Sequence, residues 1–187
     1  MGGGDGGQIL ITDSLFERLG AGGSAHGIYV SADRVLIRNS RILASQGEGH
    51  EVKTRARETI IESSVIASLG GVDSRLIDIS NGGILKVTGS VLHKGPLSSN
   101  GDLIGFGLEG LRFPDNRIEI SGNVLILERA GPNRILHTKS EVATRFEGNL
   151  IVGSPADPVP AGNTLKRNRA SAGLPPAPNL PPPGKHH

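Results

Sequence analysis

The chain has 187 residues, with 20 Lys and Arg residues against 18 Asp and Glu residues, and its formal net charge is +2. This charge is too small for a nucleic-acid-binding surface, and no stripe of Lys and Arg with interleaved aromatic residues is present. The absence of cysteine excludes disulfides and thiol chemistry. No run approaches the roughly 18 apolar residues that a membrane span needs.

Glycine and proline divide the chain near residue 154. The body is rich in glycine, whereas nine of the 12 prolines lie beyond Gly153. The sequence therefore predicts one domain at residues 1–154 and a Pro-rich tail or linker at residues 155–187. We expect this tail to be extended polyproline that links to another segment or caps the last turn of the domain.

Six segments of the body share one pattern of apolar alternation, a two-residue polar corner and a second apolar pair. They are ILITDSLF, VLIRNSRI, TIIESSVI, LKVTGSVL, IEISGNVL and TRFEGNLI, with the corner residues Ser14, Ser40, Ser64, Ser90, Asn123 and Asn149. By subtraction the corners are 26, 24, 26, 33 and 26 residues apart, and LRFPDN is an insertion in the longest gap. This repeat predicts an all-β protein, a right-handed parallel β-helix of about six rungs, in which like residues stack about 4.8 Å apart.

A second strand precedes each corner strand, in HGIYVS, HEVKTR, RLIDIS, DLIGFG and RILHTK. Alternate residues of a strand point to opposite faces. The predicted inward columns are Ile28, Val52, Ile77, Ile104 and Leu136, then Val30, Thr54, Ile79, Phe106 and Thr138. The predicted outward columns are Tyr29, Lys53, Asp78, Gly105 and His137, then Ser31, Arg55, Ser80, Gly107 and Lys139.

The corner strands have their own outward positions, and these predict a solvated face without a function. Arg38 should lie over Glu62, and Glu119 should lie between Lys86 and Arg145. Opposite charges in neighbouring strands stabilise a sheet and its register.

The segment HEVKTR concentrates polar side chains on the other face. Lys53 and Arg55 project from the same side, with Asp78 one rung from Lys53 and Tyr29 one rung away in the other direction. The first two glycines of IGFGLEG leave the neighbouring surface bare, so we expect a shallow groove with charged walls that can hold a sugar chain. The alternative is that Lys53 and Asp78 form an exposed ion pair worth about 0 to 1 kcal/mol and nothing more.

Other residues are assigned to substrate binding because they border this face. His26 and His50 occupy equivalent positions at the turns that lead into their strands. Asn81 and Asn100 fit a sugar or Ca²⁺ but are first of all turn residues, and no acidic Gly-Asp repeat for calcium is present. No metal site or cofactor is predicted. The remaining assigned residues are Lys94, Glu109, His137 and Lys139.

The repeat resembles the pectate-lyase-like right-handed β-helix superfamily over about residues 8–152. GHEVKTRA, RLIDISNGG, HKGPLSSN and IGFGLEG further resemble an uncharacterised bacterial β-helix group. The superfamily contains polysaccharide lyases, uronate epimerases and glycoside hydrolases together with noncatalytic adhesins and tailspike-like proteins. The resemblance therefore implies a fold more specifically than a reaction.

A closer parallel is the chondroitinase B and alginate lyase type, whose lysine base is followed by a small hydroxyl residue, as Lys53 is by Thr54. Here the glutamate lies two residues before the lysine, and the next rung has Asp78 in place of an arginine. In a lyase or epimerase of this kind Lys53 is the base, Tyr29 the acid at the leaving oxygen, and Arg55 the clamp on the substrate carboxylate.

We therefore expect a protein that binds, and cleaves by β-elimination or epimerises, an acidic uronate-containing polysaccharide in an extracellular or periplasmic location. The alternative is a noncatalytic carbohydrate-binding or structural module, or a fragment of a larger enzyme. A hydrolase would use Asp78 with Glu109, the one carboxylate pair near this face. An uncovered β-helix end predicts either further chain upstream or self-association.

Overall fold

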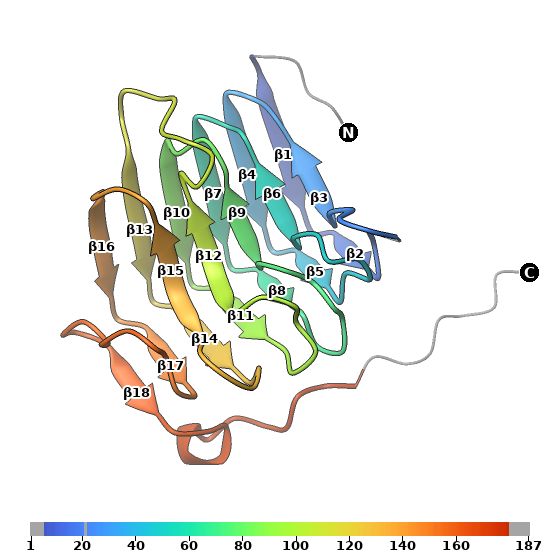
Figure 1. Cartoon of the computed structure of the whole chain (residues 1–187), viewed down its shortest axis with the longest axis vertical. Coiled ribbons are helices and arrows are strands. Elements are labelled where there is room, and N and C mark those ends of the chain that lie inside the picture. Colours follow the sequence, from blue (N-terminus) through green and yellow to red (C-terminus); the bar gives the residue numbers. More distant parts are fainter. Residues whose placement is uncertain (1–5, 21, 180–187) are drawn as a thin grey trace, which may run out of the picture.

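The computed structural model describes residues 6–20 and 22–179, which coil through three parallel β-sheets (Figure 1). Among these residues the one helix is the 3₁₀ helix η1 (Ala170–Ala172). The fold is a parallel β-helix of about six rungs, as the repeat predicts. No helix in the described part of the chain is long and apolar enough to cross a membrane.

Successive rungs contribute strands to the three sheets in turn, except that β17 is followed by β18 with no sheet C strand between them. Sheet A contains β1 (Gln8–Thr12), β4 (Arg34–Arg38), β7 (Glu58–Glu62), β10 (Ile84–Thr88), β13 (Arg117–Ser121) and β16 (Ala143–Glu147). Sheet B contains β2 (Leu15–Glu17), β5 (Arg41–Leu43), β8 (Val65–Ala67), β11 (Val91–Lys94), β14 (Val124–Leu127), β17 (Leu150–Val152) and β18 (Thr164–Lys166). Sheet C contains β3 (Ile28–Val30), β6 (Val52–Thr54), β9 (Ile77–Ile79), β12 (Asp102–Phe106) and β15 (Arg134–Thr138).

The predicted register of sheet C is confirmed. Ile28 pairs with Val52, Val52 with Ile77, Ile77 with Ile104 and Ile104 with Leu136. The first four of these side chains are buried in the core, and Leu136 is half-buried beside it. Because the side-chain period of a strand is two, the next residue of each strand (Tyr29, Lys53, Asp78, Gly105 and His137) points outward.

The polar corners form the predicted ladder between sheets A and B. The backbone amide of each corner residue donates to the side-chain oxygen of the next corner, as from Ser14 to Ser40 at 3.2 Å and from Ser64 to Ser90 at 3.1 Å. Asn123 and Asn149 continue the ladder, and Asn163 extends it by one step. The side chains thus satisfy amides that the bend removes from the sheets.

The outer face of sheet A carries two of the predicted charge pairs. Arg38 Nε lies 3.0 Å from Glu62 Oε2, and Arg145 Nη1 lies 3.5 Å from Glu119 Oε1. These contacts join neighbouring rungs on a solvent-facing surface. They fit the predicted role in register and require no ligand.

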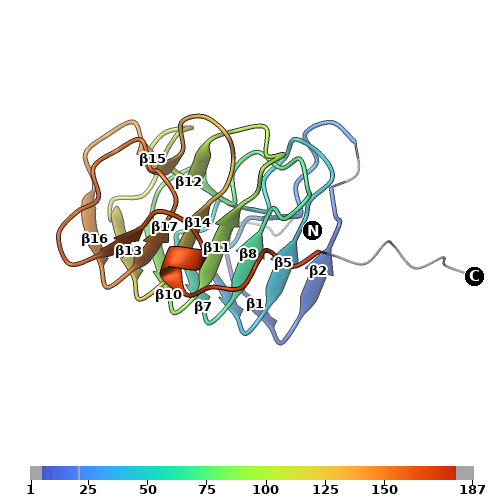
Figure 2. The same cartoon turned by 90° about the horizontal axis from the view of Figure 1, so that it is seen from below.

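The segment predicted as a tail contributes to the coil. β18 pairs with β17, Val159 packs against the core, and an isolated bridge joins Asn133 to Pro155. After η1 the chain runs back along the outer side of sheet B (Figure 2). The residues after 154 therefore close one end of the coil before they become an extended segment.

Candidate functional site

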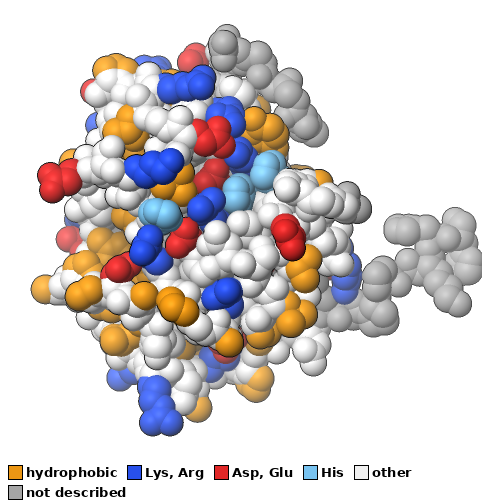
Figure 3. All heavy atoms as spheres, in the orientation of Figure 1, with side chains coloured by type: hydrophobic (Ala, Val, Ile, Leu, Met, Phe, Trp, Pro, Cys, Tyr) orange, Lys and Arg blue, Asp and Glu red, His pale blue; other side chains and the backbone are white. Residues whose placement is uncertain are grey.

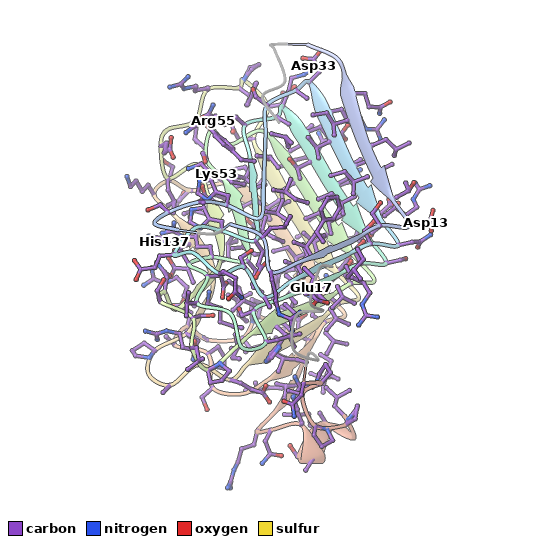
Figure 4. The ribbon with its side chains drawn as sticks, turned by 90° about the vertical axis from the view of Figure 1, so that its right-hand side faces the viewer. Asp13, Glu17, Asp33, Lys53, Arg55 and His137 are labelled. Carbon is purple, nitrogen blue, oxygen red and sulfur yellow. The ribbon has the colours of Figure 1, made fainter. Side chains whose placement is uncertain are left out.

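The polar residues of sheet C lie together on its outer face, as the outward columns predict. Tyr29 pairs with Lys53, Lys53 with Asp78, and Gly105 with both Asp78 and His137. Figure 3 shows basic, acidic and histidine side chains gathered over one face of the coil. Lys53, Arg55 and His137 project from the same side of the molecule in Figure 4. We call this surface, with Glu109 above it, the sheet C polar face.

Glu109 lies at the centre of the sheet C polar face. It follows β12 in a turn whose glycines, Gly107 and Gly110, have φ of 64° and 111°, and its amide donates to the Ser80 carbonyl at 3.0 Å. Lys53 Nζ donates to Glu109 Oε1 at 2.7 Å, and Arg55 Nη2 donates to Oε2. These hydrogen bonds from Lys53 and Arg55 lower the pKa of the Glu109 carboxyl to about 2. One carboxylate is therefore held by two cations.

Arg55 connects residues of three rungs. Its Nε donates to the Tyr29 phenol oxygen at 2.7 Å, and its Nη1 donates to Asn81 Oδ1 at 2.9 Å. The hydrogen bonds to Tyr29 and Glu109 raise the pKa of the guanidinium further above its ordinary value. All five of its N–H groups point along one plane, so this set of partners holds the guanidinium in a single orientation.

Lys53 and Asp78 are buried, which corrects the expectation of an exposed pair. Lys53 is 8% exposed and Asp78 is 3% exposed. Asp78 Oδ2 accepts from Ser80 Oγ at 2.6 Å and lies 3.5 Å from Lys53 Nζ, and Arg75 Nη1 is 3.6 Å from Oδ1. The side chains of Arg75 and Glu109 cover the two residues, and sequence periodicity does not report such a cover.

The prediction of a bare groove beside Gly105 and Gly107 is also wrong, because side chains cover this part of sheet C as well. A Cβ on Gly105 would lie 2.7 Å from Arg75 Cδ and 2.8 Å from Asp78 Oδ1. A Cβ on Gly107 would collide with the Leu111 side chain. The two glycines leave room for Arg75 and Leu111, so the predicted floor is filled by protein.

His26 and His50 form a ring ladder at the edge of the face. Their rings stack with centroids 4.9 Å apart and an interplanar angle of 10°. The His50 amide donates to His26 Nδ1 at 2.9 Å, and the Arg75 amide donates to His50 Nδ1 at 3.1 Å. Burial lowers the pKa of His50 to about 4 and also lowers that of His26. Each Nδ1 therefore accepts a backbone hydrogen bond, which is a structural role.

The network continues to the far rungs through residues that the sequence interpretation missed. Arg75 Nε lies 3.3 Å from Asp102 Oδ2, and the same oxygen is 2.7 Å from His137 Nδ1. Aligning HEVKTR with RLIDIS and DLIGFG places Arg75 and Asp102 in the column of His50. This alignment is the sequence feature that could have identified Arg75 and Asp102 as residues of the sheet C polar face. Lys139 Nζ donates to the Leu108 carbonyl at 2.6 Å and so supports the turn that carries Glu109.

Two assigned residues do not join the sheet C polar face. Lys94 is fully buried and pairs with Asp73 at 3.2 Å, so its assignment to a groove edge is wrong. Asn100 Oδ1 accepts from the Asp102 amide at 2.7 Å, which is the turn role that an Asn-Gly pair favours.

The site thus offers a carboxylate held between a lysine and an arginine, beside a tyrosine that is 44% exposed. In the described part of the chain no group of three or more His, Cys, Asp or Glu side chains is placed to hold a metal ion. In comparisons with known proteins, no family model, no curated protein and no solved structure matches this chain.

Proposed function

We propose that this β-helix binds an acidic, uronate-containing polysaccharide without cleaving it. A sugar carboxylate would take the place that the Glu109 carboxylate occupies between Lys53 and Arg55. The observation that carries this proposal is the convergence of two cations on one carboxylate whose side chain is 43% exposed and lies on a glycine-flanked turn. Arginine and lysine are the usual partners of a bound carboxylate.

Tyr29 supplies an apolar surface next to this carboxylate position. Lys53 Nζ and Arg55 Cζ each lie 5.8 Å from the centroid of its ring, and the His26 ring meets it edge-on at 5.4 Å. An exposed aromatic ring beside charged donors is a common way to hold a polar ring with an apolar face. The likeness of the repeat to the pectate-lyase-like superfamily supports an acidic polysaccharide as the ligand class, in a cell envelope or outside the cell.

The contacts of Lys53 and Asp78 favour binding over cleavage. A base has to reach the proton that it removes, directly or through one water. The Lys53 amine is nearly buried and contacts the Glu109 and Asp78 carboxylates. Asp78 is covered, so it does not provide one of the two opposed carboxyl groups that glycoside hydrolysis needs.

A lyase is the second candidate, and one contact of Tyr29 favours it. Because Arg55 Nε donates to the phenol oxygen, the phenol proton is left for another acceptor on the exposed side. A leaving glycosidic oxygen bound there would be such an acceptor. Displacement of Glu109 by substrate would then leave Lys53 facing the uronate.

Calorimetric titration with tetragalacturonate and with tetramannuronate tests the proposal. We expect Glu109→Gln to bind about 10-fold more tightly than the parent, because the competing carboxylate is gone, and Arg55→Gln to lose binding. Glu147→Gln is the matched control, since Glu147 is a half-exposed carboxylate paired with Arg145 on sheet A. It should bind like the parent.

The outcomes separate the candidates. If neither the parent nor Glu109→Gln binds any uronate oligomer, the carbohydrate function is wrong. If ultraviolet absorbance of an unsaturated uronate grows with time in the parent and not in Tyr29→Phe, the lyase replaces the binding module.

A further inference from the structure

The first rung forms an apolar end of the coil. β1, β2 and β3 are the outermost strands of sheets A, B and C, and among the described residues none pairs with their free edges. Figure 4 looks onto this end. Leu10 on β1 is 61% exposed, and a cavity of about 400 Å³ opens among Ile9, Ile11, Phe16 and Ile28.

The opposite end of the coil is built differently. There the segment that contains Val159 packs against the core, and the Gly148 amide donates to the Gly162 carbonyl at 2.7 Å. The outermost strand of sheet A at that end, β16, carries Arg145 and Glu147. Charges and a covering segment protect a sheet edge from further pairing. A second copy that stacks on the first rung is therefore not expected to use this covered end.

The backbone of β1 has a regular set of unused groups. The Arg34 amide donates to the Gly7 carbonyl at 3.2 Å, and the Asp13 amide donates to the Arg38 carbonyl at 3.2 Å. Gly7 and Asp13, which flank β1, therefore direct these groups toward β4. Because successive residues of a strand direct their N–H and C=O groups to opposite sides, the other odd-numbered residues, Ile9 and Ile11, also bond to β4. The residues that direct these groups to the free side are Gln8, Leu10 and Thr12. None of the three has a charged side chain.

We infer that β1 of one copy pairs in antiparallel orientation with β1 of a second copy, about a two-fold axis through Leu10. Leu10 then forms a hydrogen-bonded pair with the same residue of the second copy, and Gln8 faces Thr12. Ile9 and Ile11 face each other on the core side of the joined sheet. Asp13 lies opposite Gly7, so its carboxylate meets no like charge.

This arrangement is self-complementary, which is the requirement for a closed two-fold dimer. It continues sheet A across the axis and places the two apolar ends against each other. An uncharged edge strand without proline is a template for such pairing. The partner that fits this edge is therefore a second copy of the chain.

Sedimentation and light scattering on the complete chain test the inference. We expect the parent to be a dimer and Leu10→Lys to weaken association by at least about 100-fold, because two ammonium groups then meet at the axis. The Leu10 side chain is exposed, so the variant should keep the circular dichroism and the Tm of a parent sample diluted to monomer. Leu165→Lys is the matched control: Leu165 is 50% exposed on β18, at the covered end, and its replacement should leave the dimer intact.

A cysteine supplies a second readout, because the chain contains none. Facing residues of a hydrogen-bonded antiparallel pair have Cα atoms about 5.5 Å apart, within the roughly 4.4–6.8 Å that a disulfide spans. Mild oxidation of Leu10→Cys should give a covalent dimer, and Leu165→Cys should stay unlinked. A parent that is monomeric at all concentrations overturns the inference. So does a dimer that survives Leu10→Lys, or open-ended filaments.

Discussion

Two lysines of this coil pair with carboxylates in different surroundings. Lys94 and Asp73 are both fully buried, and Asp73 Oδ1 also accepts from Ser98 Oγ at 2.7 Å. Lys53 instead donates to Glu109, whose side chain is 43% exposed. The type of residue is the same in the two pairs. Solvent access to the carboxylate partner distinguishes a pair that belongs to the interior from one whose partner a ligand can replace.

The buried pair belongs to a cluster of three ionisable residues, Lys94, Asp73 and Glu51. Glu51 accepts from the Ser45 amide at 2.8 Å and from Ser45 Oγ at 2.7 Å. Burial, with the nearby Asp73, raises the pKa of the Glu51 carboxyl to about 7. Burial also lowers the pKa of Lys94, against the attraction of Asp73. These shifts show the cost of keeping charges away from water.

Removing Lys94 should have the largest effect. Lys94→Met leaves Asp73 buried without its cation, so we expect a loss of about 3–5 kcal/mol in the free energy of unfolding. Urea unfolding followed by circular dichroism measures it. Lys94→Met with Asp73→Asn should recover part of the loss. An effect of Lys94→Met below that of Lys53→Met would contradict the distinction between the two pairs.

Glu51→Gln should give a smaller effect that depends on pH. The folded pKa of about 7 lies above the ordinary 4.5, so folding favours the protonated carboxyl. The parent therefore loses stability as pH rises from about 4.5 through 7. By linkage the shift corresponds to about 3 kcal/mol, which is the upper limit of the gain for Glu51→Gln at pH 8. At pH 4.5 the gain should nearly vanish.

The neighbouring His50 contributes a pH dependence of stability that opposes that of Glu51. Its folded pKa of about 4 lies below the ordinary 6.5, so its neutral form is favoured and stability falls as pH drops from 6.5 through 4. The two residues oppose each other between pH 4 and 7. In Glu51→Gln the His50 trend should emerge as a loss of stability on acidification. A difference between variant and parent that is constant with pH would refute the assignment to Glu51.

The repeat made much of this architecture predictable. The inward columns and the corner ladder follow from a period of two within each strand and a rung of about 26 residues, which one insertion lengthens to 33 residues between Ser90 and Asn123. Asn163 lies only 14 residues after Asn149, so its step in the ladder breaks that spacing and was missed. β18 was missed with it, because prolines surround it.

The side chains that cover the strands were not predictable in the same way. Asp73, Glu109 and Leu111 lie in connections between strands, where lengths differ from rung to rung and no period applies. The sequence therefore located Lys53 on the correct face but did not show that it is buried, and it assigned Lys94 to the border of that face although Lys94 is fully buried. Burial of an outward residue depends on what the loops place above it.

Lys53→Met should cost less than loss of Lys94. Asp78 then keeps the Ser80 hydroxyl and Arg75 as partners, so we expect a loss of about 1–2 kcal/mol in the free energy of unfolding. Urea unfolding measures it, with Lys86→Met on sheet A as a control that should change stability by less than about 0.5 kcal/mol. If Lys53→Met destabilised the protein as little as the control does, the ion pair of Lys53 and Asp78 would contribute no more than an ordinary exposed pair.

The smallest effect should come from Arg38 and Glu62, which provide the reference for an ion pair without a cover. Their side chains are 49% and 35% exposed, with Nε and Oε2 3.0 Å apart. An exposed pair gains little Coulomb energy in water, so a double-mutant cycle with Arg38→Ala and Glu62→Ala should give a coupling of about 0.2–0.5 kcal/mol that high salt removes. The same cycle on Lys53 and Asp78 should give a larger coupling that salt changes less, because both partners are buried. Equal couplings with equal salt dependence would mean that the cover over Lys53 does not exclude water.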